Sequence, residues 1–138
     1  MSTSLKRGRS AIPIARPQSC ATSRSCMQLE ERDRALLYDM LDAARHLREM
    51  WQQRSIEELL NDRTLQWATD RGFNIIGEAA RRLSDAAKLG HPDIEWRRII
   101  GLRNVVVHDY DEVDYARHWR VIREDLPQLI LKLEKLGL

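Results

Sequence analysis

The residue types best suited to chemistry lie close together between Arg103 and Tyr110, in the stretch RNVVVHDY. Arg103 supplies a permanent positive charge, His108 an imidazole that titrates near ~6.5, and Tyr110 a phenol. The five positions from Arg103 to His108 correspond to about 140° of rotation on an ideal helix. The two side chains can therefore converge if the helix ends near His108, because the long arginine side chain reaches along the helix axis.

A structural role is the alternative for each of these residues taken alone. Arg103 could be a surface residue of an amphipathic helix, and the helix dipole could favour His108 at a helix C-terminus. Tyr110 could pack its ring against neighbouring helices. The combination of a cation, an imidazole and a phenol at one predicted helix end is more specific than any one of them.

Four segments with helical periodicity contain or surround this stretch. Their apolar residues recur at spacings of three and four, the pattern of amphipathic helices. The predicted helices cover about 29–53, 62–86, 94–108 and 114–136. Because the connecting segments are short, we expect an all-α antiparallel bundle of four to five helices.

Capping and helix-breaking residues mark the ends of these segments. Gly90 followed by Pro92 ends the second helix, and Pro127 predicts a kink inside the last one. Gly72 and Gly77 disfavour a helix interior, so their presence predicts a closely packed neighbouring helix. The candidate N-caps are Ser55 with Glu58 in a capping box, Asn61 or Asp62, and Asp111 or Asp114.

The net charge of +2 is unevenly distributed. Residues 1–26 carry five basic residues and no acid, which leaves 18 of the 23 basic residues against all 21 acidic ones in 27–138. The high pI therefore belongs to the first 26 residues and does not indicate that the folded part is a basic nucleic-acid binder. No apolar run approaches the ~20 residues that span a bilayer.

Residues 1–26 are interpreted as a disordered basic extension, followed by a helical domain over 27–138. An organelle transit peptide, translated sequence upstream of a true start at Met27, and a tail that contacts nucleic acid by charge are the open alternatives. Cys20 and Cys26 both lie in this extension, so a disulfide framework or a cysteine zinc site is not expected. The absence of cysteine from the domain suits a cytoplasmic protein.

The pattern Arg-x4-His-x-Tyr, with Asn104 after the arginine, resembles the signature of the HEPN superfamily in its HepT toxin branch. Three further stretches are similar to the same branch, and the resemblance covers about residues 30–136. They are NIIGEAAR at 74–81, WRRIIGLRN at 96–104 and DLP at 125–127. Asp109 departs from the small or flexible residue usual between the histidine and the tyrosine.

This resemblance implies a helical bundle that forms a homodimer, with two copies of the motif facing each other in one composite site. It further implies a metal-independent ribonuclease toxin that needs no cofactor and acts on RNA. Its implied partner is a nucleotidyltransferase antitoxin similar to MntA, which would silence the toxin by transferring AMP to Tyr110.

The resemblance also assigns roles that the residue types can fulfil. His108 could serve as the general acid or base of RNA cleavage, because imidazole titrates close to neutral pH. Arg103 could pair with the phosphate and stabilise charge that grows in the transition state. Asn104 could orient His108 or hydrogen-bond the phosphate, and Tyr110 would accept AMP.

Other candidates have structural alternatives of similar or greater weight. Glu78 lies in a family-like stretch, but a solvated or capping carboxylate is equally consistent with its position. His46, His91 and His118 are scattered without metal-ligand spacing. Trp51, Trp67, Trp96 and Trp119 are expected as core or interface anchors rather than base-stacking platforms.

Two further functions compete with the ribonuclease hypothesis. One is a non-catalytic helical module that binds a nucleotidyltransferase partner or its substrate, although such a module would not need both Arg103 and His108. The other is a helix-turn-helix DNA binder, which the acidic domain and the lack of a basic recognition helix disfavour.

Overall fold

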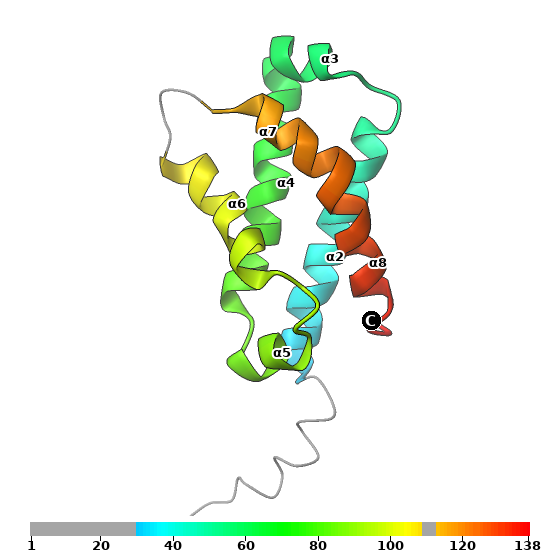
Figure 1. Cartoon of the computed structure of the whole chain (residues 1–138), viewed down its shortest axis with the longest axis vertical. Coiled ribbons are helices and arrows are strands. Elements are labelled where there is room, and N and C mark those ends of the chain that lie inside the picture. The colour runs from blue at the N-terminus through cyan, green and yellow to red at the C-terminus, as the bar shows by residue number, and fades with distance from the viewer. Residues whose placement is uncertain (1–29, 109–112) are drawn as a thin grey trace, which may run out of the picture. The chain divides into compact units, whose positions relative to one another are not determined.

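The structure is a computed structural model that describes residues 30–108 and 113–138, with the side chains of 104–108 left out. The described residues form helices joined by short connections (Figure 1), which confirms the predicted all-α fold. In chain order the elements are α2 (Glu31–Trp51), α3 (Ile56–Asn61), α4 (Arg63–Arg82), α5 (Asp85–Gly90), α6 (Trp96–His108), α7 (Tyr115–Arg120), η1 (Val121–Asp125) and α8 (Leu126–Glu134). None of the helices described is long and apolar enough to cross a membrane.

Helix α4 occupies the middle of the bundle and packs against both α2 and α6 (Figure 1). Its small residues allow this, as the sequence predicted. A Cβ atom at Gly72 would lie 2.7 Å from the side chain of Leu47 on α2, so a larger residue there would displace that leucine. The C-terminal helix α8 packs on the other side of α2.

The predicted second helix over 62–86 is divided in the structure, which corrects its C-terminal boundary. Asp62 caps it as expected by accepting hydrogen bonds from the backbone N–H groups of Thr64 and Leu65, at 2.9 and 3.2 Å. Helix α4 then ends at Arg82, and Ser84 caps the separate helix α5. The buried carboxylate of Asp33 on α2 accepts hydrogen bonds from the hydroxyl and backbone N–H of Ser84, at 2.6 and 3.0 Å. This contact joins residues 51 positions apart, which is why the periodicity did not reveal the break.

The last predicted helix, over 114–136, is also interrupted. Asp114 caps α7 by accepting a hydrogen bond from the backbone N–H of Arg117 at 3.1 Å. The π-helical segment η1 follows, and Pro127 lies in the first turn of α8. The helical backbone nonetheless continues here, since the N–H of Leu126 bonds to the carbonyl of Val121, and Pro127, which has no N–H to donate, comes just after this π-helical segment. The kink expected at Pro127 stays a prediction.

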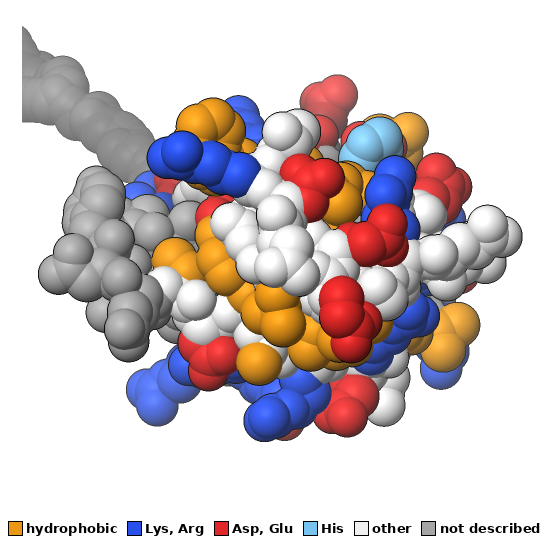
Figure 2. Space-filling model, turned by 90° about the horizontal axis from the view of Figure 1, so that it is seen from above, with side chains coloured by type: hydrophobic (Ala, Val, Ile, Leu, Met, Phe, Trp, Pro, Cys, Tyr) orange, Lys and Arg blue, Asp and Glu red, His pale blue; other side chains and the backbone are white. Residues whose placement is uncertain are grey.

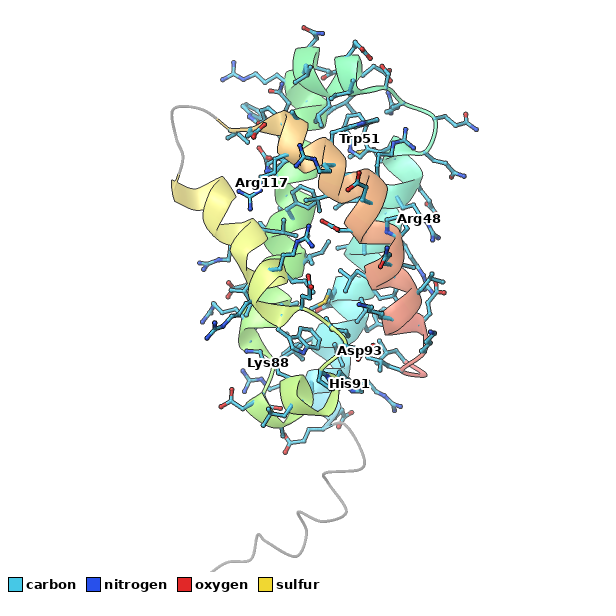
Figure 3. The ribbon with its side chains drawn as sticks, in the orientation of Figure 1. Arg48, Trp51, Lys88, His91, Asp93 and Arg117 are labelled. Carbon is cyan, nitrogen blue, oxygen red and sulfur yellow. The ribbon has the colours of Figure 1, made fainter. Side chains whose placement is uncertain are left out.

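A tryptophan forms hydrogen bonds near each end of the bundle. Seen from the α3 end, hydrophobic side chains reach the surface between basic and acidic ones (Figure 2). Beneath this end, Trp51 points from α2 toward α4 and α7 (Figure 3), where its indole N–H donates to the Thr69 hydroxyl at 2.9 Å. At the other end, the indole of Trp96 donates to the carbonyl groups of Lys88 and His91. Trp51 and Trp96 are thus the core anchors that the sequence predicted, whereas Trp67 is exposed.

Candidate active site

The backbone of α6 lies close to α4 at Gly77. A Cβ atom at Gly77 would lie 2.7 Å from the Cβ of Arg103, 3.1 Å from its backbone nitrogen and 3.2 Å from the carbonyl oxygen of Ile99. Any side chain at Gly77 would push α6 away, because two of these atoms belong to the backbone. The glycine therefore sets where Arg103 lies relative to α4.

The guanidinium of Arg103 is held by a carboxylate of the neighbouring helix. Its Nε atom lies 3.0 Å from Oε2 of Glu78, and each of the two side chains is 34% exposed. Arg81 contacts the same carboxylate, with Nη2 at 2.7 Å from Oε1 and Nε at 3.1 Å from Oε2. Glu78 therefore joins two guanidinium groups, one from its own helix and one from α6.

These contacts determine the charge of Glu78. The hydrogen bond from Arg81 holds the pKa of Glu78 below its usual value, and the positive charges of Arg81, Arg103 and Arg82 lower it further. Glu78 is ionised at neutral pH, as an ordinary carboxylate is, and is not a proton donor there. Its contact with Arg103 leaves that side chain 34% exposed.

A second polar cluster lies at the start of α7. The hydroxyl of Tyr115, the first residue of α7, donates to Asp70 of α4 at 3.1 Å. Nδ1 of His118 lies 3.5 Å from the other oxygen of Asp70, and the imidazole packs edge-on against Phe73 and Tyr115. The contact between Asp70 and Tyr115 ties the start of α7 to α4.

Burial governs the ionisation of this cluster. Desolvation lowers the pKa of His118 to about 4; the Asp114 charge opposes this shift and the Arg117 charge adds to it, so the imidazole is neutral at pH 7. Desolvation also raises the pKa of Asp70 and raises the pKa of Tyr115 to about 12. Neither ring nitrogen of His118 has a hydrogen-bond partner among the described residues.

The sequence of this chain matches one protein family over most of the bundle. The family is described as Ribonuclease HepT-like, and its profile matches residues 40–136. The chain belongs to the HepT-like family. This confirms the resemblance to the HepT branch that the motifs around Arg103 indicated.

Individual relatives agree with this assignment. A candidate RNase of Methanocaldococcus jannaschii is 32% identical over 107 residues, which cover 77% of this chain and 98% of that protein. A protein of Thermococcus cleftensis named "Probable ribonuclease HepT" is 35% identical over 100 residues, 72% of this chain and 91% of the relative. No solved structure matches the chain significantly.

Of the predicted site residues in this HepT-like chain, the structure describes the side chain of Arg103. The backbone of Asn104 and His108 belongs to α6, but their side chains lie outside the described residues, and so does Tyr110. That the side chains of Arg103 and His108 lie close together therefore stays a prediction. Glu78, for which the sequence left two interpretations, is resolved as the ion-pair partner of Arg103.

The sequence set His118 aside as a metal ligand and gave no sign of Asp70. Tyr115 and His118 lie three positions apart on α7, a spacing that places two polar aromatic side chains on one helix face just after the motif. That spacing was an available signal. The participation of Asp70 was not visible, because it comes from α4 and lies 45 positions before Tyr115.

Proposed function

We propose that this HepT-like chain is a metal-independent endoribonuclease that cleaves RNA with Arg103 and His108, assisted by Asn104. The observation that carries the proposal is the placement of Arg103. A close backbone contact at Gly77 and an ion pair with Glu78 position the first motif residue, and its side chain stays partly open to solvent. Membership of the HepT-like ribonuclease family supports RNA as the substrate.

The proposed reaction is an internal transesterification of RNA. The ribose 2′-oxygen attacks the adjacent phosphorus, its proton passes to a neutral His108, and the bond to the 5′-oxygen breaks. A protonated imidazole then gives its proton to the departing 5′-oxygen, which leaves a 2′,3′-cyclic phosphate and a 5′-hydroxyl. Arg103 pairs with the phosphate oxygens as negative charge accumulates on them.

The proposal extends to the assembly and regulation of the protein. Two copies form a homodimer in which two motifs build one site, so the two His108 residues divide the acid and base roles. The protein is a cytoplasmic toxin whose partner is a nucleotidyltransferase similar to MntA. Transfer of AMP to Tyr110 would place a bulky, negatively charged group near Arg103, where it competes with the RNA phosphate.

A non-catalytic module that binds a nucleotidyltransferase is the second candidate. The ion pair between Glu78 and Arg103 is equally compatible with it, because a purely structural arginine would make the same contact. In that case the motif would serve to hold α6 against α4 and to present Tyr110 to the partner protein.

The test is incubation of purified protein with total RNA in EDTA, after mass spectrometry has shown that Tyr110 carries no AMP. Arg103→Ala and His108→Ala are compared with the parent protein. Arg97→Ala is the matched control, since Arg97 is an exposed arginine on the same helix. We expect cleavage by the parent and by Arg97→Ala, with cyclic phosphate ends, and loss of cleavage in the two motif variants.

Intact RNA after incubation with unmodified parent protein would contradict the ribonuclease proposal and leave the non-catalytic module. Cleavage that survives both motif substitutions would indicate a contaminating nuclease or another active site. Cleavage that requires added Mg²⁺ would support RNA as the substrate but would overturn the metal-independent mechanism.

A further inference from the structure

One tryptophan of this chain lies on the surface. The side chain of Trp67 on α4 is 63% exposed, although indole is among the largest apolar groups of a protein. The guanidinium carbon of Arg63 lies 5.0 Å from the centre of its ring, within the range of a cation–π contact. The pair presents an exposed indole with a positive charge over one side of its ring.

This pair belongs to a continuous face of α4 that leads to Arg103. Positions 63, 67, 71, 74 and 78 recur at spacings of four and three, so they share one side of the helix. Arg63 and Arg71 are exposed and Asn74 is half-buried. The face ends at Glu78, which contacts Arg103. We call Arg63, Trp67, Arg71 and Asn74 the α4 outer face.

The length of this face suits a short segment of single-stranded nucleic acid. Trp67 and Glu78 are eleven positions apart, or about 16 Å along a helix. A stacked strand advances ~3.4 Å per nucleotide, so this length corresponds to about five nucleotides. A base at Trp67 and a phosphate at Arg103 would therefore belong to one short segment.

The charge of this face is opposite to that of a phosphate backbone. Among the described residues, no ion pair involves Arg63 or Arg71. The two carboxylates of α4 are engaged elsewhere, because Glu78 binds two arginines and Asp70 faces Tyr115 and His118. The face is positive, although the acidic residues of 27–138 outnumber the basic ones.

We propose that the α4 outer face binds single-stranded RNA and guides it to Arg103. A base stacks on the indole of Trp67, and Arg63 and Arg71 contact the neighbouring phosphates, a combination common in proteins that bind single strands without strict sequence preference. This inference rests on the proposed ribonuclease function, and it assigns Trp67 the base-stacking role that its sequence position did not favour.

The test measures binding of a fluorescently labelled single-stranded RNA oligonucleotide to the full chain carrying His108→Ala, so that the probe stays intact. Trp67→Ala in this background should weaken binding roughly 5- to 150-fold, the range expected for loss of one stacked base. Trp67→Phe should retain most of the affinity. Arg63→Ala and Arg71→Ala should each weaken binding and lower the salt dependence of log K by about 0.7.

A second arginine–tryptophan pair provides the matched control. Arg123 lies 4.5 Å from the centre of the Trp119 ring, in the segment formed by α7 and η1 and outside the α4 outer face. Arg123→Ala removes the same charge and the same kind of contact, and it should leave RNA affinity unchanged. An equal loss of affinity with Arg123→Ala would show that only net charge matters and would overturn the proposal.

Two further readouts separate this inference from the proposed function. If the parent chain cleaves RNA and Trp67→Ala cleaves it with the same kcat/KM, the inference fails while the ribonuclease stands. If the parent neither binds nor cleaves RNA, both fail. If Trp67→Ala changes the molar mass measured by light scattering but leaves RNA affinity unaltered, the α4 outer face contacts another copy of the protein. That result would also overturn the inference.

Discussion

Glu78 is the residue on which the arrangement around Arg103 depends. One carboxylate binds two guanidinium groups, so the side chain of Arg103 is oriented before substrate arrives. An oriented arginine loses less conformational freedom when it binds a phosphate than a freely rotating one. Glu78 is thus a positioning residue in the proposed site, and it acts through Arg103.

Replacing Glu78 by glutamine should lower kcat for RNA cleavage by roughly 10-fold, because the charge that orients Arg103 is lost. Glu95→Gln is the matched control, since Glu95 forms an exposed ion pair with Arg98 at the start of α6. RNA cleavage by both variants is measured under single-turnover conditions. Faster cleavage by Glu78→Gln would mean that the Glu78 carboxylate competes with the phosphate for Arg103. That result would contradict the positioning role of Glu78.

His118 should make the stability of the bundle depend on pH. Its pKa is about 4 in the folded chain and near ~6.5 when unfolded, so the unfolded state binds the proton more readily between these values. Stability is therefore complete above about pH 6.5 and is lost as the pH falls toward 4. We expect a loss of about 1–2 kcal/mol at pH 5 relative to pH 7.5.

Urea unfolding at both pH values, with His118→Phe for comparison, measures this effect. Phenylalanine keeps a ring against Phe73 and Tyr115 but cannot take up a proton, so the variant should show a flatter dependence on pH. Asp70 contributes with the opposite sign at lower pH because its pKa is raised, and the difference between the two proteins removes that effect. Identical pH profiles would show that His118 is not buried in its neutral form.

At the scale of the elements, the contact between α4 and α6 decides where the motif lies. Gly77 permits the approach, and Asp33 of α2 binds Ser84, the N-cap of α5, in the connection between α4 and α6. The start of α7 is tied to α4 through Asp70 and Tyr115. Tyr110 belongs to the segment 109–112. The helices before and after that segment, α6 and α7, both contact α4.

Gly77→Ala should destabilise the protein by about 1–3 kcal/mol, because the added methyl group meets the backbone of α6. The same change should reduce RNA cleavage, since Arg103 is displaced with the helix. Gly101→Ala on α6 is the control, because a Cβ there has no neighbour within 4 Å among the described residues. That variant should gain up to ~1 kcal/mol from the better helix propensity of alanine.

Thermal and urea unfolding of both glycine variants, with their RNA cleavage rates, distinguishes a local effect from a general one. Equal stability of Gly77→Ala and the parent would show that α6 can shift at little cost. In that case the close contact would not be what positions Arg103.

At the scale of the whole molecule, the proposed site requires two chains. We expect light scattering to give a mass near twice the 16.2 kDa of one chain. Mixing the parent chain with an excess of the His108→Ala chain should lower the cleavage activity per parent chain, because each mixed dimer keeps one imidazole and lacks either the acid or the base. A monomeric protein that cleaves RNA would overturn the composite site. The proposed extension over 1–26 lies outside the described residues, and its role stays a prediction.

The sequence by itself determined the helical class, the approximate helix positions and the motif, because apolar periodicity, capping residues and prolines act over a few neighbouring positions. It also predicted a close neighbour at Gly77, though not which residue that neighbour would be. Only the tertiary structure decided that Glu78 binds Arg103, that Asp70 contacts Tyr115 and that Asp33 binds Ser84. These contacts join different helices, so patterns of neighbouring residues in the sequence do not indicate them. The exposure of Trp67 likewise depends on which helices cover α4, since its position in the sequence is equally suited to a core anchor.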